Sequence, residues 1–272
     1  MKTILGSQVV NVWAAGTQDI GFNRSHGNLF FKGDAIYSYG THFPFALRLP
    51  WGFLINGDTH SNTTAKHQAG VRHVIRTTGR PSVIVPFSSL RSAGISYADV
   101  LLVDREPDRI LPITRSRGDR TWVPGLHLMG RSVIMANGTY YLSGLDETMR
   151  DPWHGHFLAQ LPCPAATVSD ALEALKPAIV RNAEATPVKR QGEWFFIPVD
   201  KPLGIIQHKW LLVNRDPARR KAHRATYYIS PNYVSGTIRH LEGDHKMLTL
   251  GKQWYMAYEN TEIRSFRGGR VD

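Results

Sequence analysis

The chain has 272 residues, of which 42% are hydrophobic and 20% charged, a balance typical of folded domains rather than disordered chains. Its longest apolar runs fall short of the roughly eighteen residues of a membrane-spanning helix, and its broken apolar N-terminus differs from a secretory signal. We therefore expect no membrane partner. Lys and Arg outnumber Asp and Glu by 33 to 22, giving a net charge of +11 that favours polyanionic partners such as nucleic acid.

The chain contains one cysteine, Cys163. A single cysteine excludes an intramolecular disulfide and any zinc site built from several thiolates. A reducing compartment is the natural place for such a chain, so we expect a cytoplasmic protein.

The first hundred residues read mainly as strands separated by turn signals. We expect Lys32-Gly33-Asp34 to form the turn of a hairpin. Pro44 and Pro50 predict an edge strand or irregular structure between them, because proline cannot donate to a sheet. Asn56-Gly57 is a further strong turn signal. The strands expected here are residues 1–16, 29–31, 35–39, 51–55, 81–87 and 100–103.

Two helices and a strand-rich second half complete the predicted elements. Residues 64–76 and 167–185 have helical patterns, the latter with Thr167 as its cap and a break at Pro177. Asn137-Gly138 predicts a second hairpin within residues 126–145. The remaining strands expected are residues 188–199, 209–214, 226–230, 233–240, 247–250 and 253–258.

Together these elements predict a β-rich α+β fold with antiparallel sheets and few helices. We expect a single domain spanning residues 1–272. A subdivision near residues 165–187, where the second predicted helix lies, is the alternative.

No complete catalytic motif is present, so an active site would have to be assembled from scattered residues. The best candidate catalytic set is His42, Asp58, His60 and His67, at a strand end, a turn and a helix start. Imidazoles and a carboxylate could act as acid and base, or His60 and His67 could bind a divalent metal ion, the one cofactor we consider. Surface and capping roles are the structural alternative, since the chain has twelve histidines.

Three further groups of titratable residues have weaker patterns. His154 and His156 are separated by one glycine, and His240, Asp244 and His245 flank a turn. The acidic residues of the segment 104–109 could bind Mg²⁺, but arginines alternate with them, which favours a solvated loop. We expect structural roles for most of these residues.

Basic residues near tyrosines predict contacts with nucleic acid. Cations neutralise phosphates, and aromatic rings on neighbouring strands stack exposed bases. From residue 201 to the end, thirteen Lys and Arg stand against six Asp and Glu. The expected phosphate contacts are Arg115, Arg117, Arg120, Arg215, Arg219, Arg220, Lys221 and Arg224. The expected stacking residues are Tyr227, Tyr228 and Tyr233, unless they pack in the core.

Short segments of the chain also resemble uncharacterised proteins carried by bacterial phages and plasmids. They are YSYGTHFPFA, NGDTHSNTTAKHQ, KRQGEWFFIP and SGTIRHLEGDH. The resemblance implies no fold, reaction or catalytic residue. It favours a role in mobile-element biology, where proteins that act on nucleic acid are common.

The leading hypothesis is a nucleic-acid-binding protein that contacts RNA or single-stranded DNA through arginines and strand-borne aromatics. One alternative is a metal-dependent nuclease, or another nucleic-acid-processing enzyme, that uses the His/Asp set. A second alternative is a structural or assembly protein of a phage particle. The sequence leaves the oligomeric state open.

Overall fold

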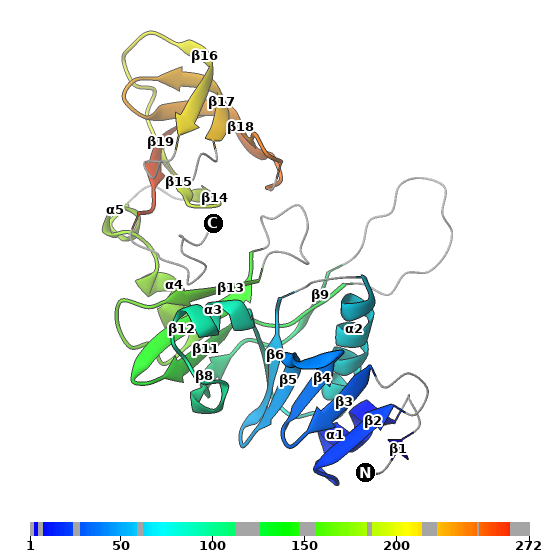
Figure 1. The fold of residues 1–272 in the computed structure, drawn as a ribbon. Coiled ribbons are helices and arrows are strands. Elements are labelled where there is room, and N and C mark those ends of the chain that lie inside the picture. The colour runs from blue at the N-terminus through cyan, green and yellow to red at the C-terminus, as the bar shows by residue number, and fades with distance from the viewer. Residues whose placement is uncertain are drawn as a thin grey trace.

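The structure, a computed structural model, describes residues 3–4, 8–23, 28–58, 62–111, 126–146, 156–183, 187–213, 222–243 and 245–261. Strands dominate, and most pair antiparallel in three sheets and one two-stranded ribbon (Figure 1). The prediction of a β-rich α+β fold with few helices is confirmed. None of the helices in the described ranges is long and apolar enough to cross a membrane.

The N-terminal sheet has seven strands that lie side by side in the order of the chain. Neighbours are antiparallel except at two crossovers. Helix α1 (Val9–Ala15) connects the parallel pair β1–β2, and helix α2 (Asn62–Thr77) connects the parallel pair β6–β7. The strands are β1 (Thr3–Ile4), β2 (Ile20–Asn23), β3 (Leu29–Lys32), β4 (Ala35–Ser38), β5 (Gly40–Leu49), β6 (Gly52–Asn56) and β7 (Ser82–Val85).

Helix α1 replaces most of the strand expected over residues 1–16, so that prediction is wrong for Val9–Ala15. Val9, Val10, Trp13 and Ala14 are buried, a spacing that places them on one face of a helix rather than on alternate faces of a strand. Gly16 ends the helix in the left-handed conformation, with φ of 68°.

Strand β5 contains Pro44 and lies between β4 and β6, so the expected edge strand or irregular segment is also wrong. Pro44 pairs with Tyr37, where the register of β4 and β5 shifts. Such irregular pairings tolerate a residue without an N–H. The Pro44 carbonyl accepts a hydrogen bond from Asn56 Nδ2 at 3.0 Å, which ties β5 to the end of β6.

The second sheet is antiparallel in the order β13-β12-β11-β8, and the predicted turn at Asn137-Gly138 joins β11 to β12. Ser143 Oγ on β12 donates to the Ile84 carbonyl on β7 at 2.5 Å, so this sheet packs beside the parallel pair. Its elements and neighbours are α3 (Phe87–Ser92), the 3₁₀ turn Tyr97–Asp99, β8 (Leu101–Arg105), β9 (Arg109–Leu111), β10 (Leu126–Leu128), β11 (Ser132–Ala136), β12 (Thr139–Leu145) and β13 (His156–Gln160).

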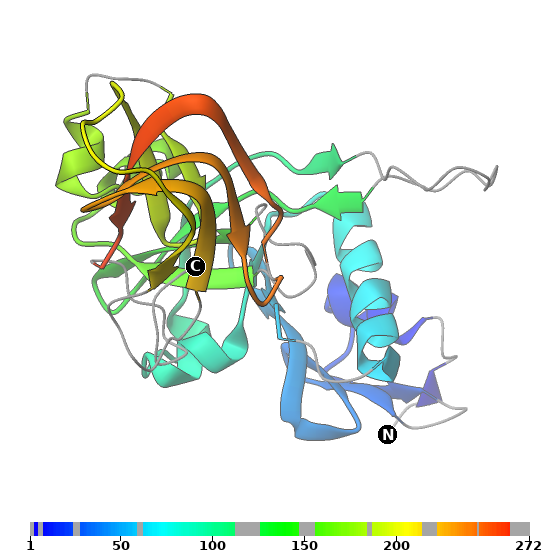
Figure 2. The same cartoon turned by 90° about the horizontal axis from the view of Figure 1, so that it is seen from above.

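The C-terminal sheet has six strands in the order β14-β15-β19-β18-β17-β16, and the long β19 curves across it (Figure 2). Before it come α4 (Val168–Ala174) and α5 (Ala178–Arg181), divided at Pro177 as predicted. The strands are β14 (Lys189–Gln191), β15 (Trp194–Val199), β16 (Gln207–Val213), β17 (Ala222–Ile229), β18 (Tyr233–His240) and β19 (Leu248–Glu259).

Separate groups of buried side chains form the cores. Trp13, Phe31 and Phe53 belong to the core of the N-terminal sheet. Phe196 and Tyr228 belong to a core within the C-terminal sheet. Figure 1 shows that sheet set apart from the other two, so its strands present their own surface to solvent.

Candidate nucleic-acid interface

The exposed side of β16, β17 and β18 carries two neighbouring arginines. Arg224 on β17 pairs directly with Arg239 on β18, and both side chains are exposed. Directly paired residues of antiparallel strands point to the same face, so both guanidinium groups lie on one surface. Among the described residues, neither arginine forms an ion pair. Their charges are therefore free to attract an anion.

An aromatic ring lies on the same surface beside a register shift between β17 and β18. Ala225 pairs with Ile238 but Tyr227 pairs with Ser235, so β18 has one extra residue here, and Tyr227 is 40% exposed. The Tyr227 ring meets the exposed His208 ring on β16 at 5.3 Å between centroids, edge to face. Thr226 is two residues from Arg224 and therefore lies on the same face, and its Oγ1 lies 2.7 Å from Thr237 Oγ1. We call His208, Arg224, Thr226, Tyr227, Thr237 and Arg239 the outer face.

Gly236 allows Tyr227 to lie close to the backbone of β18. A Cβ atom on Gly236 would come within 3.1 Å of Tyr227 Cδ2 and 2.8 Å of Thr226 Cβ. Gly236 also has a φ of +86°, which side chains rarely adopt. The position of the ring therefore depends on a glycine on the neighbouring strand.

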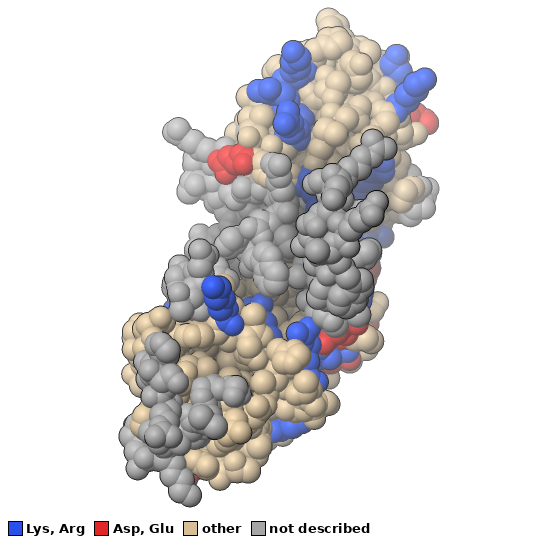
Figure 3. All heavy atoms as spheres, turned by 90° about the vertical axis from the view of Figure 1, so that its right-hand side faces the viewer, with Lys and Arg blue, Asp and Glu red and all other residues tan. Residues whose placement is uncertain are grey.

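The expected basic run adjoins this surface in the chain. Residues 214–221 join β16 to β17, and they include Arg215, Arg219, Arg220 and Lys221. These four lie outside the described residues. This segment connects Val213 to Ala222, and these two residues pair with each other. Ala222 stands two residues before Arg224 on β17. Figure 3 shows further Lys and Arg side chains over the C-terminal sheet at the top of the molecule.

The other two predicted stacking tyrosines do not share the exposure of Tyr227. Tyr228 is buried on the opposite face of β17, where its ring stacks on Trp210 at 4.8 Å. Its Oη donates a hydrogen bond to the Pro231 carbonyl at 2.5 Å. Tyr233 is half-buried at the start of β18. Of the three predicted stacking tyrosines, Tyr227 alone is exposed.

The buried face of the same strands contains a cluster of three histidines. His223 pairs with His240, their ring centroids are 4.8 Å apart, and His245 lies 5.0 Å from His240. All three are buried. The sequence grouped His240 with His245 but not with His223, because the pairing of β17 with β18 is not visible in the sequence. In the described part of the chain, no group of three or more His, Cys, Asp and Glu could hold a metal ion.

Asp58 of the predicted catalytic set is buried in a network of structural hydrogen bonds. Its two carboxylate oxygens accept from the Ser88 N–H and the Ser88 hydroxyl, each at 2.7 Å. Gln68 Nε2 on α2 donates to its carbonyl at 2.7 Å. Asn56 Oδ1 accepts from the Asp58 N–H at 2.9 Å. The network fixes the turn after β6 between α2 and the start of α3.

The histidines of that set lie on other elements. His67 Nδ1 on α2 is 3.0 Å from Ser38 Oγ on β4, and burial lowers the pKa of His67. His42 is exposed near the start of β5. His60, like the expected phosphate contacts Arg115, Arg117 and Arg120, lies outside the described residues. The structure thus places Asp58 against Ser88 and His67 against Ser38, and a metal site at His60 and His67 stays a prediction.

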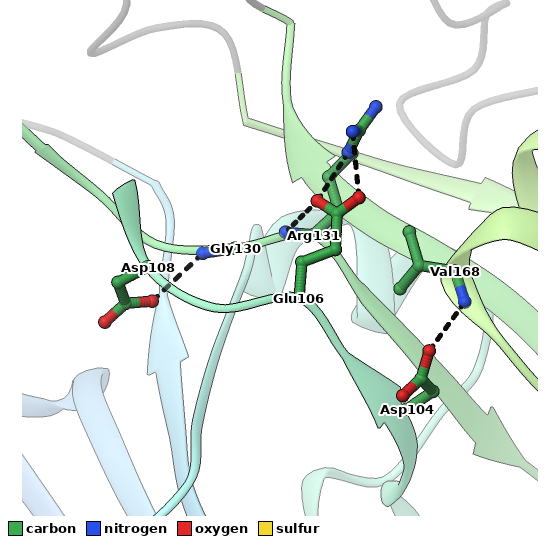
Figure 4. A network of polar contacts seen from close by, with 6 residues as sticks. All are labelled: Asp104, Glu106, Asp108, Gly130, Arg131 and Val168. Carbon is green, nitrogen blue, oxygen red and sulfur yellow. Dashed lines mark hydrogen bonds and ion pairs between the residues drawn. The ribbon is translucent and has the colours of Figure 1, made fainter. Parts of the chain in front are cut away.

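The acidic residues of the segment 104–109 are occupied by protein donors (Figure 4). Arg131 Nε and Nη2 donate to the Glu106 carboxylate at 2.8 and 2.9 Å. The N–H of Gly130 donates to Asp108 Oδ1 at 3.0 Å, and the N–H of Val168 donates to Asp104 Oδ2 at 2.7 Å. Burial raises the pKa of Glu106, but the hydrogen bond and charge of Arg131 outweigh it and lower the pKa overall. These carboxylates join segments of the fold.

No protein-family model matches the chain, and no curated protein or solved structure is significantly similar to it. Any function assigned to the protein must therefore come from its own residues and their placement.

Proposed function

We propose that the protein binds single-stranded nucleic acid, RNA or DNA, on the outer face of β16–β18. The observation that carries the proposal is the pair Arg224 and Arg239, exposed side by side and without ion-pair partners among the described residues. Two exposed cations side by side can neutralise neighbouring phosphates, and such phosphate contacts supply a large share of the affinity for nucleic acid.

The single-stranded form is favoured by Tyr227. Its exposed ring lies on the same face as the two arginines, next to the ring of His208. An unpaired base can stack on such a ring, whereas a base inside a duplex is already stacked on its neighbours. The segment 214–221, which joins β16 to β17 in the chain, adds four cations in sequence.

The cellular setting is part of the same proposal. The free Cys163 is exposed, and an exposed thiol is suited to a reducing cytoplasm. The resemblance to phage and plasmid proteins supports a role on the nucleic acid of a mobile element.

Fluorescence anisotropy of labelled oligonucleotides tests the proposal. We expect single-stranded DNA or RNA to bind at low salt, more tightly than a duplex, and the affinity to fall as salt rises. Arg224→Gln combined with Arg239→Gln should lower the slope of log affinity against log salt by about 1.4, since each single-strand phosphate contact contributes about 0.7. Tyr227→Ala should cost about 1–3 kcal/mol of binding free energy while leaving the slope unchanged.

Matched variants separate the outer face from net charge. Lys66→Gln combined with Arg76→Gln removes two exposed charges from α2, and this variant should bind like the wild type. Arg219→Gln, Arg220→Gln and Lys221→Gln together should weaken binding further. The proposal fails if oligonucleotides do not bind at low salt, or if the α2 variant loses as much affinity as the arginine pair.

A further inference from the structure

Arg72 on α2 carries a positive charge that lies inside the protein next to the β6–β7 crossover. Its Nη2 donates weakly to the Asn56 carbonyl at 3.4 Å, an acceptor shared with Gln68 Nε2. Among the described residues, no carboxylate contacts the guanidinium. Burial, together with the charge of Arg76, lowers the pKa of Arg72 to about 10. Buried charges are normally paired, so an unpaired buried arginine requires an explanation.

Two nitrogen atoms in this region lack hydrogen-bond partners. Arg72 Nε and His156 Nδ1 are both inaccessible to solvent, and neither has a hydrogen-bond partner of normal geometry in the described part of the chain. The Gly144 backbone lies near enough to the His156 ring to raise its pKa slightly, against the larger lowering by burial and Arg72. Native structures leave few buried polar atoms unpaired, and each such atom calls for an explanation, of which a bound ion or water is one. As whole residues, Arg72 and His156 are half-buried rather than fully enclosed.

His156 and Arg72 both lie near residues 56 and 57, where the two sheets adjoin. His156 begins β13, and its Cβ lies 3.2 Å from the point that a Cβ on Gly57 would occupy. Gly57 follows β6, whose last residue, Asn56, pairs with Val85 at the end of the parallel strand β7. Arg72 is close enough for its charge to lower the pKa of His156, in addition to the larger effect of burial. The carboxyl ends of adjacent parallel strands are the usual position of ligands in sheets crossed by helices.

We propose that Arg72 and His156 form a binding site for a small oxyanion, the phosphate or carboxylate group of a small-molecule ligand. An oxyanion would neutralise the buried guanidinium and accept from its Nε, and arginine presents a planar fork that fits both groups. The neutral His156 ring would complete the site with a hydrogen bond and without a second charge. This site is separate from the outer face and does not depend on nucleic-acid binding.

The test is a titration of the full chain with inorganic phosphate and, separately, with acetate, each against sodium chloride at equal ionic strength. Histidine ring resonances observed by NMR report on the site directly. We expect phosphate, acetate or both to shift the His156 resonances in a saturable way. Arg72→Gln should weaken the apparent affinity by about tenfold or more, because it removes the charge-assisted hydrogen bonds.

Control variants keep the test specific. Lys66→Gln, an exposed change on the same helix, should titrate like the wild type, as should the variant that lacks Arg224 and Arg239. If Arg72→Gln does not fold, Arg72→Lys replaces it, since lysine keeps the charge but loses the fork. A His156 spectrum that responds to neither anion beyond the chloride control would overturn the proposal. So would a response that persists unchanged in the Arg72 variants.

Discussion

The ring of His156 stays neutral in the folded protein over the whole physiological pH range. Burial and the charge of Arg72 lower its pKa to about 3, whereas an unfolded chain binds this proton near pH 6.5. The folded pKa lies below the unfolded one. The stability that this residue contributes is therefore complete above about pH 6.5 and is lost as the pH falls toward the folded pKa.

Replacing His156 should flatten the dependence of stability on pH. Between about pH 7 and about pH 5, the wild type should lose up to about 2 kcal/mol of unfolding free energy through this group, at about 1.4 kcal/mol per pH unit below 6.5. His156→Gln should lose less over that range, whatever its stability at neutral pH. Urea denaturation in a buffer without phosphate or carboxylate measures the difference. Equal losses in both proteins would show that His156 titrates normally.

The chemistry of single residues was only partly predictable from the sequence. Arg224 and Tyr227, which the sequence suggested as contacts, are both exposed, and their contact with nucleic acid stays a prediction. The roles of His156, Arg72 and His223 were not predictable. These residues are buried because two sheets approach one another or because two strands pair. Neither contact leaves a pattern in the spacing of residues along the sequence.

At the scale of elements, helix α4 begins with a capping box that can be recognised from the sequence alone. Thr167 Oγ1 accepts from the Asp170 N–H at 3.1 Å, and Asp170 Oδ2 accepts from the Thr167 N–H at 3.1 Å. Thr167→Ala should lower the unfolding free energy by about 1 kcal/mol, the usual value of such a cap. Chemical denaturation measures it, and Ser169→Ala in the first turn serves as the control. An effect no larger than that of the control would contradict the prediction.

The position of Tyr227 beside the register shift between β17 and β18 can be tested by a substitution that changes no charge. Gly236→Ala should displace Tyr227, because the new Cβ would meet the ring and Thr226, and oligonucleotide affinity should fall by several-fold. Gly251→Ala is the matched control. Gly251 pairs with Gly236, has a similar φ of +75°, and has open space where its Cβ would lie.

Anisotropy titrations of the two glycine variants separate the steric effect from backbone strain. Both substitutions force an alanine into the left-handed region, so both should cost stability. Only Gly236→Ala should reduce binding of single strands. Equal losses of affinity would show that the ring position is not what matters.

Local patterns predicted the elements where they act within a few residues. The hairpins at Gly33 and Gly138, the helix over residues 62–77 and the break at Pro177 all follow from such signals. The failures at α1 and β5 have a common cause. Valines favour strands and proline disfavours them, but packing against the rest of the sheet outweighed both preferences.

At the scale of the molecule, separate cores lie on either side of the segment 165–187. Phe53 and Phe196 are fully buried, one in the core of the N-terminal sheet and the other in that of the C-terminal sheet. The hydrogen bond from Asn260 Nδ2 to the Leu175 carbonyl at 3.2 Å joins the end of the C-terminal sheet to the segment itself. The single-domain prediction and the subdivision near residues 165–187 can be distinguished experimentally.

Large-to-small substitutions in each core provide that distinction. Phe53→Ala and Phe196→Ala should each cost about 3–5 kcal/mol of unfolding free energy. If the chain is subdivided, Phe196→Ala should reduce hydrogen-exchange protection in β15–β18 and leave β5–β7 protected. In a single cooperative domain, either substitution should reduce protection in both sheets equally.

The strand orders of the two large sheets imply different times of formation during synthesis. Each strand of the N-terminal sheet lies beside the strand made just before it, so pairing can proceed while later residues are still on the ribosome. In the C-terminal sheet, β15 pairs with β19, the last strand described. The order β15-β19-β18 therefore cannot be completed until residue 259 has emerged, and the outer face becomes supported on both sides only after β19 has been translated.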